Sequence, residues 1–245
     1  MYTGNMKIFN IFYGDFSGNG SQTVELTNYL AGNLGSSSWY DILSSYYRIV
    51  NGKKIFVQGS LSFAGSYNLF PTWRRNSTTV ATIRQNIASY IFDRGIVKPD
   101  PNTIYAVIFR GDFRVSNAGK QFWLDDWCGV HTGLLLEDDN NFYPIFMVGD
   151  MSSVDADLQF PCSVDLPPPN GIVADSVANT YAHEVAEVIT DPKLSLDFGW
   201  TFNPGPNRSS TPWENADECG WIFTKSFVHV GAKNYSLQKN WQPGT

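Results

Sequence analysis

Residues 171–192 read Gly-Ile-Val-Ala-Asp-Ser-Val-Ala-Asn-Thr-Tyr-Ala-His-Glu-Val-Ala-Glu-Val-Ile-Thr-Asp-Pro, and the interpretation of the whole chain starts from this stretch. Its apolar residues recur mostly every three or four positions, which is the spacing of one face of an α-helix. Pro192 cannot continue a helix, so the pattern ends there. The stretch predicts one helix of about five turns at the centre of the fold.

The chemistry of this helix is concentrated in three side chains. His183 and Glu187 are four residues apart and lie on one face, whereas Glu184 is rotated by about 100° to the flank of that face. In a His-Glu-x-x-His helix the two imidazoles bind zinc and the intervening Glu is the general base. Here a carboxylate replaces the second imidazole, and zinc accepts carboxylate oxygens too. We predict His183 and Glu187 as metal ligands and Glu184 as the catalytic base.

A third ligand is expected from the polar segment 213–219, Trp-Glu-Asn-Ala-Asp-Glu-Cys. One zincin arrangement takes its third ligand from a downstream Glu and orients a His ligand with a nearby Asp. Glu214 and Asp217 are three apart and share a face if the segment forms a helical turn, so either is predicted as the third ligand. Two carboxylates weaken the Lewis acidity of zinc, which makes Ca²⁺ or Mn²⁺ the alternative ions. Without a metal, Glu187 is a solvated or ion-paired carboxylate.

The composition is that of a globular protein that can bury a substantial core. Of 245 residues, 42% are hydrophobic and 15% aromatic, and the net charge is −6. A negative chain without a run of Lys or Arg does not suit a phosphate backbone, so no nucleic-acid partner is expected. The apolar run 105–109 is far shorter than the ~20 residues that a bilayer needs, and no membrane span is predicted.

Several features favour a secreted protein located outside the cell. Residues 1–5 have no basic start and no apolar stretch, so no signal peptide is visible and we expect a mature form. Four Asn-x-Ser/Thr triplets are compatible with glycosylation in a secretory pathway. They begin at Asn19, Asn76, Asn207 and Asn234.

The three cysteines predict one disulfide and one free thiol if the protein is extracellular. Spacing alone does not choose the pair. We hypothesise that Cys219 is bridged to Cys128 or Cys162, because such a bridge would brace the ligand segment. His131 follows Cys128 closely, and we interpret it as packing beside a disulfide rather than as half of a catalytic Cys-His pair.

The order of patterns predicts an α/β (α+β) fold, with one domain over 1–245 that contains a mixed sheet and packed helices. An N-terminal α/β part spans about 1–150, and the metal-site helix with the C-terminal part spans about 163–245. Strands are predicted at 7–14, 54–63, 103–110, 132–137 and 141–148, and helices at 21–35, 38–47, 79–92 and 171–192. Residues 111–131 are expected to form a long loop, 161–170 an extended connector, and 193–213 an irregular segment.

Several short motifs together resemble the EXORDIUM or phosphate-induced-protein family of extracellular plant proteins and its microbial, possibly fungal, relatives. The resemblance implies secretion to the cell wall or medium and no settled activity. The His183-Glu184-Val185-Ala186-Glu187 helix is similar to that of microbial members, whereas typical plant members lack the His-Glu pair. This departure implies a zincin-like scaffold. The motifs are residues 8–17, Trp39-Tyr40, Tyr46-Tyr47, 127–132, 170–173 and 214–219.

The favoured function is a secreted zinc-dependent hydrolase, a metallopeptidase acting on a peptide or protein substrate. The alternative is a non-catalytic extracellular protein that binds cell-wall carbohydrate or a protein partner through aromatic side chains. A third interpretation is a glycosidase that uses Glu184 and Glu214 as paired carboxylates. Candidates for the carbohydrate surface are Trp73, Trp123, Trp200, Trp213 and the segment Asp125-Asp126-Trp127.

Overall fold

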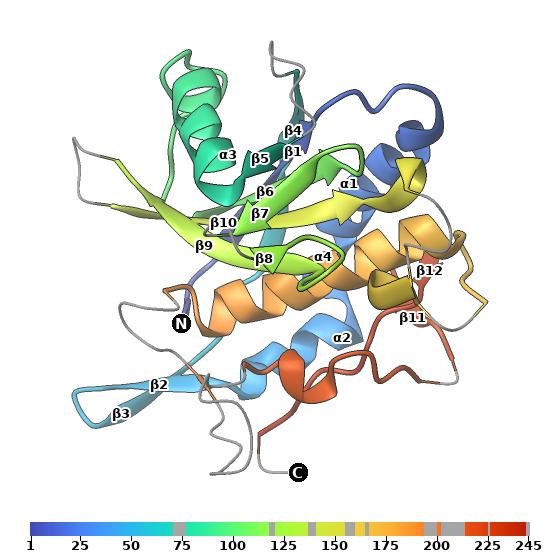
Figure 1. The fold of residues 1–245 in the computed structure, drawn as a ribbon. Helices are drawn as coiled ribbons and strands as arrows, with labels where there is room; N and C mark the ends of the chain where they lie inside the picture. Colours follow the sequence, from blue (N-terminus) through green and yellow to red (C-terminus); the bar gives the residue numbers. More distant parts are fainter. Residues whose placement is uncertain are drawn as a thin grey trace.

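The computed structural model has a mixed α/β fold with one central sheet and several packed helices (Figure 1). The expected α+β class with a mixed sheet is therefore confirmed. The structure describes residues 1–70, 77–117, 121–136, 141–154, 160–164, 167–193, 200–201, 214–224 and 226–243. Among these residues, no helix is both long and apolar enough to cross a bilayer.

The central sheet has five strands. Their spatial order is β4 (Leu61–Leu69), β1 (Met6–Tyr13), β6 (Thr103–Arg110), β10 (Phe142–Asp150) and β9 (Gly129–Leu135). β4, β1, β6 and β10 are parallel, whereas β9 runs antiparallel to β10 at one edge. The chain thus places one antiparallel strand beside four parallel ones.

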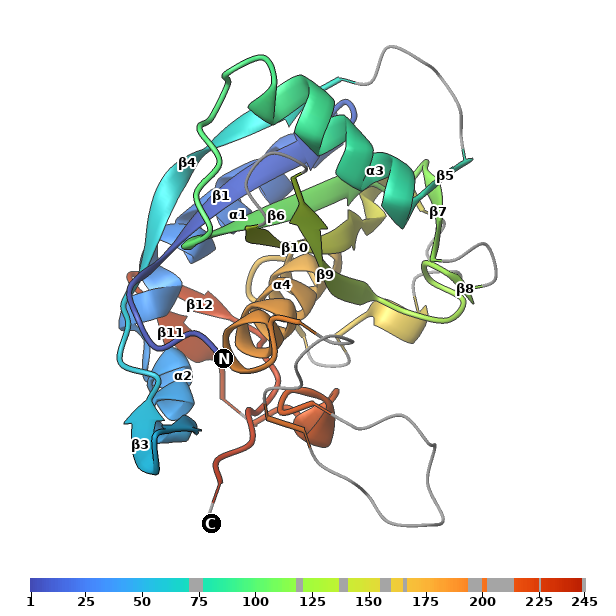
Figure 2. The same cartoon turned by 90° about the vertical axis from the view of Figure 1, so that its left-hand side faces the viewer.

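Helices cover both faces of this sheet (Figures 1 and 2). α1 (Ser21–Asn33) and α4 (Ile172–Thr190) pack on one face, while α3 (Val80–Ile87) and the π-helical turn Ala88–Phe92 pack on the other. Strands buried on both faces are apolar along their whole length, which explains the unbroken apolar runs of β1 and β6. In β6, alternate residues enter the two cores: Ile104, Ala106 and Ile108 on the α4 side, and Tyr105, Val107 and Phe109 on the α3 side.

Smaller elements surround the sheet. α2 (Ser38–Asp41) runs into the 3₁₀ turn Ile42–Ser45 and then into a hairpin of β2 (Tyr47–Val50) and β3 (Lys53–Phe56). A second small sheet joins β5 (Ser77–Thr79), β7 (Arg114–Asn117) and β8 (Gln121–Phe122), and a third joins β11 (Val228–Val230) and β12 (Lys233–Tyr235). Further 3₁₀ turns lie at Gly18–Gly20, Leu34–Ser36, Met151–Ser153, Phe160–Cys162 and Asp217–Cys219.

The long periodic elements agree with their prediction, namely β1, α1, α3 with its π turn, β6 and α4. The prediction of one strand at 54–63 is wrong, because β3 and β4 are separate strands with the irregular residues 57–60 between them. Ser60 donates its backbone N–H to the Asn5 side chain, and Gly59 packs against the backbone of Gly4 so closely that a Cβ would collide with it. Contact with the N-terminal segment therefore ends the strand pairing there.

Two other predicted segments also differ. The helix expected at 38–47 is shorter, because Tyr46 is already extended and its carbonyl accepts the N–H of Val57. The loop expected at 111–131 contains β7, β8 and the start of β9. β7 pairs with the distant β5 and forms a local antiparallel pair with β8, neither of which the local pattern indicates. Most of the segment 193–213 lies outside the described residues.

Candidate metal centre

The helix α4 is the scaffold of the candidate site, and nearly all of its length is buried. It begins after Gly171, whose φ of 90° favours glycine, and its first turn is held by the Asp175 carboxylate, which accepts the Asn170 N–H at 2.8 Å. At its end the Thr190 hydroxyl donates to the Ala186 carbonyl, and Pro192 follows. Between these two ends, the middle of α4 packs against the sheet on one side and against the C-terminal segment on the other.

The first cluster on this helix comprises His183, Glu187 and Asp217, which we call the outer triad. His183 Nε2 lies 2.9 Å from Glu187 Oε1 and 3.7 Å from Asp217 Oδ1. One ligand atom from each residue lies within 4.8 Å of the others. The His183 side chain is 19% exposed and that of Asp217 is 43% exposed. The outer triad therefore opens to solvent, as a site that must receive a substrate requires.

The second cluster comprises His131, Glu184 and Glu187, which we call the inner triad. His131 comes from β9, and its Nδ1 lies 3.4 Å from Glu184 Oε2 and 3.4 Å from Glu187 Oε2. All three side chains are at most 5% exposed. His131 Nε2 lies 3.0 Å from the backbone carbonyl of Asp191. Since a carbonyl only accepts, Nε2 carries a proton. Nδ1 faces the two carboxylates; burial alone would lower the pKa of the His131 imidazole, but these carboxylates outweigh burial and raise it.

The structure separates the two candidates for the third ligand. Asp217 belongs to the outer triad, and one of its oxygens accepts the Glu214 N–H at 3.3 Å. The Glu214 side chain instead lies on the His131 side, with Oε1 3.4 Å from His131 Nε2. Of the sequence-predicted residues, His183, Glu187 and Asp217 thus come together around one point, and Glu214 lies apart from that point.

A cavity of about 400 Å³ adjoins the cluster. Its wall includes His183, Glu184, Asp217, Trp127, Trp221 and Gln238. Gly129, the first residue of β9, also lines it, and a Cβ at Gly129 would lie 2.3 Å from Glu184 Oε1. A side chain at position 129 would therefore displace Glu184, and glycine lets Glu184 lie at the cavity wall beside the backbone of β9.

The charges of the cluster are strongly coupled. Burial opposes ionisation of His183, yet the charges of Glu187, Glu184 and Asp217 raise the pKa of its imidazole to about 10. Burial raises the pKa of the Glu214 carboxyl, and the charge of Glu187 adds to it, giving about 9. The pKa of Glu187 changes in the opposite direction. Burial alone would raise it, but the charges and hydrogen bonds of His183 and His131 lower it to about 2. Glu187 is therefore the most firmly ionised carboxylate of the group.

Among the described residues, two buried carboxylate oxygens, Glu184 Oε2 and Glu214 Oε1, have no hydrogen-bond partner and make only contacts of 3.4 Å with His131. Leaving a buried charged oxygen without a partner is costly, and a cation is one group that satisfies it. The contacts of 3.4 Å around His131 Nδ1 are long for hydrogen bonds. They match the spacing of about 3.3–3.4 Å between two zinc ligands that are each about 2.0–2.1 Å from the ion at a tetrahedral angle. The buried His131, Glu184 and Glu187 group can hold a metal ion.

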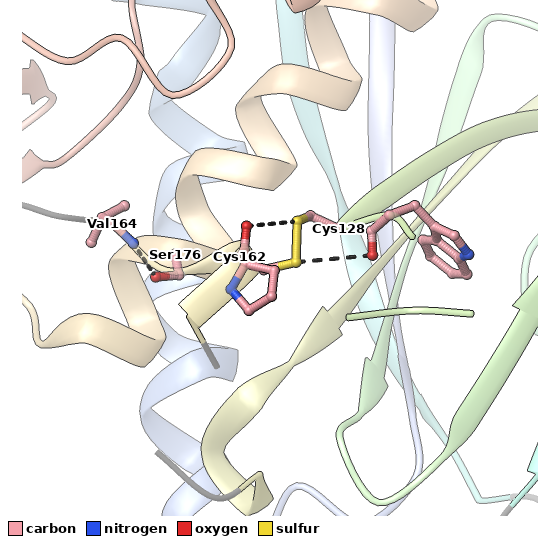
Figure 3. The surroundings of a disulfide bond; sticks show 6 residues. Cys128, Cys162, Val164 and Ser176 are labelled. Carbon is pink, nitrogen blue, oxygen red and sulfur yellow. Dashed lines mark hydrogen bonds between the residues drawn. A yellow bond between two sulfur atoms is a disulfide. The ribbon is translucent and has the colours of Figure 1, made fainter. Parts of the chain in front are cut away.

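A disulfide joins Cys128 and Cys162 (Figure 3). Both cysteines line the cavity. The segment that carries Cys162 is held to α4 by a hydrogen bond of 3.0 Å from the Val164 N–H to the Ser176 hydroxyl. The expected inventory of one disulfide and one thiol is confirmed. The hypothesis that Cys219 is bridged is wrong, because Cys128 and Cys162 pair with each other and Cys219 is a thiol. The bridge fixes the start of β9 against the helix that carries the site.

His131 is the residue that the sequence interpretation missed. The disulfide at Cys128 is present, but His131 does more than pack beside it, since it faces Glu184 and Glu187. Two signals pointed to it: the chain has only three histidines, and this one immediately precedes a predicted strand. Neither signal indicates that this strand is the neighbour of α4.

The tryptophans proposed for a carbohydrate surface do not form one among the described residues. Trp123 is 6% exposed and packs edge-on against Phe109 in the core, so that expectation is wrong for Trp123. Trp200 packs against Tyr46. The segment Asp125-Asp126-Trp127 lines the cavity instead. Trp73 and Trp213 lie outside the described residues.

Comparison with known proteins adds no relative. The chain matches no family model, and searches of the curated proteins and of the solved structures also gave no match. Interpretation of the site therefore rests on its own geometry.

Proposed function

We propose that this protein is a metal-dependent hydrolase that cleaves peptide or protein substrates, with zinc as the ion. The observation that carries the proposal is the outer triad, in which one imidazole and two carboxylates converge at the wall of a cavity beside a further carboxylate, Glu184. A catalytic zinc site has three protein ligands and one open position. His183, Glu187 and Asp217 are three such ligands, and the cavity supplies the opening.

Each residue has a definite task in this proposal. A bound zinc ion supplies Lewis acidity, which acidifies water and polarises a carbonyl. His183, Glu187 and Asp217 hold the ion. Glu184, fixed at the cavity wall by the close approach of Gly129, accepts a proton from the attacking water and passes it to the leaving amine. Burial raises the pKa of Glu184, which is the direction needed for a base that must also act as an acid.

Gln238 contacts the Nδ1 atom of His183, the ring nitrogen that does not face the other two residues of the outer triad. Its amide is oriented by two neighbours: Nε2 donates to the Ala216 carbonyl at 2.8 Å, and Oε1 accepts the Trp221 N–H at 3.3 Å. Nε2 therefore faces His183 Nδ1, at 3.1 Å. Ligation through His183 Nε2 requires the ring proton on Nδ1. The Gln238 amide must then turn so that Oε1 accepts this proton.

A peptide substrate is favoured by the place of β9 at the edge of the sheet. β9 pairs with β10 on one side, and the described strands give it no partner on the other. Unpaired backbone groups on an edge strand bind extended peptides by adding a strand. Gly129 at the start of β9 is at the cavity wall, so a peptide paired with this strand would pass the candidate metal ligands.

The wider assignment is also part of the proposal. A metal-site helix packed under a mixed sheet is what a zincin-like scaffold with a His-Glu-x-x-Glu helix requires, and the motifs similar to the EXORDIUM family suggest a microbial relative. The Cys128–Cys162 disulfide is compatible with an extracellular location. Among the alternatives, the glycosidase has less support, because Glu184 and Glu214 both lie against the buried imidazole of His131 and not across the cavity from each other.

The first experiment is elemental analysis of the purified protein before and after chelation, with His183→Ala and His229→Ala measured in parallel. His229 is exposed and lies in a short outer strand, so it is a matched control for loss of an imidazole. We expect zinc that chelation removes, a reduced zinc content in His183→Ala, and no change in His229→Ala.

A peptide-library assay then tests hydrolysis, with Glu184→Gln as the variant that keeps the shape of the base but not its basicity. We expect cleavage by the wild type and a loss of about 10²–10⁴-fold in Glu184→Gln. A protein that binds zinc but cleaves no peptide would contradict the hydrolase. A protein that takes up no metal would favour the non-catalytic alternative, and glycan binding would be measured next.

A further inference from the structure

Glu187 faces two imidazoles with its two oxygens. Its Oε1 lies 2.9 Å from His183 Nε2, and its Oε2 lies 3.4 Å from His131 Nδ1. Both triads contain this carboxylate, and they contain no other residue in common. A carboxylate with one oxygen in each of two ligand sets is arranged to bridge two cations.

The inner triad has the features of a preformed ligand set. His131 donates its Nε2 proton to the Asp191 backbone carbonyl, which is how metal-binding histidines are usually held, and Nδ1 is thereby directed at Glu184 and Glu187. Glu184 is 2% exposed, and its Oε2 has no hydrogen-bond partner. The three atoms already converge, and a cation that binds them displaces the proton of His131 Nδ1.

Charge also favours more than one ion. The cluster contains four carboxylates, Glu184, Glu187, Glu214 and Asp217, and the buried side chain of Asp191 borders it. Imidazoles that bind metal are neutral, so they do not offset these charges. Glu214, whose pKa is about 9, is largely neutral at pH 7, so the charges to be compensated are those of Glu184, Glu187 and Asp217. One divalent cation balances two of these three carboxylates and leaves one for a second ion, and buried charge is tolerated only when it is compensated.

We propose that the cluster binds two divalent cations, with Glu187 as the bridge. The inner ion is held by His131 Nδ1, Glu184 Oε2 and Glu187 Oε2, and the outer ion by the outer triad. Imidazole with carboxylate oxygens suits zinc and manganese. The inner ion reaches its ligands past Glu184, which lines the cavity. The Oε1 atom of Glu184, beside Gly129, is left to accept a proton. The inference deepens the proposed function, but ion binding is measured without any turnover.

The test is a metal titration of chelator-treated wild-type protein, once with Zn²⁺ and once with Mn²⁺. We expect two ions per chain, and in the manganese-loaded protein an electron paramagnetic resonance spectrum with coupling between the two ions. A single ion per chain, or two ions with uncoupled spectra, would overturn the inference. This measurement needs no variant, so a folding defect cannot obscure it.

Variants then assign the two positions. His131→Ala and His183→Ala should each bind one ion per chain, and His229→Ala should bind two. Circular dichroism checks that the His131 variant is folded, because this side chain is buried. Two coupled ions without peptide hydrolysis would leave the inference intact and contradict the proposed function. Peptide hydrolysis with only one ion per chain would support the proposed function and contradict the inference of two ions.

Discussion

The inner and outer triads share Glu187, yet they are built in opposite ways. The inner triad joins a strand to a helix, its side chains are buried, and a backbone carbonyl fixes its imidazole. The outer triad joins the same helix to the turn Asp217–Cys219, is open to the cavity, and has its imidazole contacted by a side-chain amide. The imidazole of the buried half is held by a backbone group, whereas the imidazole of the open half contacts a side-chain amide that can turn.

This difference is what a hydrolytic centre would need. A substrate must displace solvent from an exposed position, so some ligands must tolerate a change in their surroundings. Other ligands must hold their geometry while that change occurs, and secondary structure holds positions more precisely than loops do. The comparison predicts that substitutions near the shared carboxylate affect both halves and that substitutions farther out affect one half only.

The largest effect is expected from Glu187→Gln, because both triads lose an anionic ligand. Metal content should fall from two ions per chain to none. Hydrolysis should fall at least about 10³-fold, since Lewis-acid catalysis supplies several kcal/mol. Elemental analysis and a peptide-cleavage assay on the same samples measure both quantities. If one ion were retained with full affinity, Glu187 would not be the bridge.

The next effect separates Asp217 from Glu214. Asp217→Asn removes an outer ligand, so the affinity of the outer position should fall by more than the 10–100-fold that loss of an outer-shell partner costs. Glu214→Gln is the matched control, because Glu214 contacts His131 from the side away from Nδ1. Two ions should still bind to this control. Titration of both variants would reveal an exchange of roles if Glu214→Gln were the weaker binder.

Much of the fold could be predicted from local patterns. α4 was predictable because its apolar period is helical and Pro192 ends it, and β6 because an apolar run lies between turn signals. The same helix placed His183, Glu184 and Glu187 on adjoining faces, since helical geometry alone determines that relation.

The inner half of the site could not be predicted in this way. His131 and Glu184 are far apart in the sequence, and they meet because β9 pairs antiparallel with β10 at the edge that α4 covers. Strand pairing of this kind is a non-local choice that periodicity does not encode. Non-local packing also determines the disulfide partner of Cys128. It likewise determines that Asp217 lies beside His183 whereas Glu214 lies beside His131.

A smaller effect should follow from Gly129→Ala, which acts on the inner half through shape. The added Cβ would lie 2.3 Å from Glu184 Oε1 and 2.7 Å from Thr180 Cγ2, both at the ends of side chains, so these side chains move and we expect the fold to survive. A displacement of about 1 Å at a catalytic group can cost about 10²-fold in rate. Gly32→Ala is the control, since its Cβ would meet only Phe63 Cβ at 3.9 Å. Peptide cleavage and thermal unfolding of both variants test this, and unchanged cleavage by Gly129→Ala would show that the position of Glu184 is unimportant.

The smallest effect is expected from Gln238→Leu, which acts on the outer half alone. Leucine cannot accept the Nδ1 proton that His183 must carry when Nε2 binds a cation, so the outer affinity should fall by about 10–100-fold. The inner position is a control within the same molecule, because His131 is held by the backbone carbonyl of Asp191, which this substitution leaves in place. A two-phase zinc titration should therefore keep one phase and shift the other. Equal loss of zinc affinity in both phases would mean that Glu187 couples the inner and outer triads strongly. The two triads would then not differ in how they respond to a change in their surroundings.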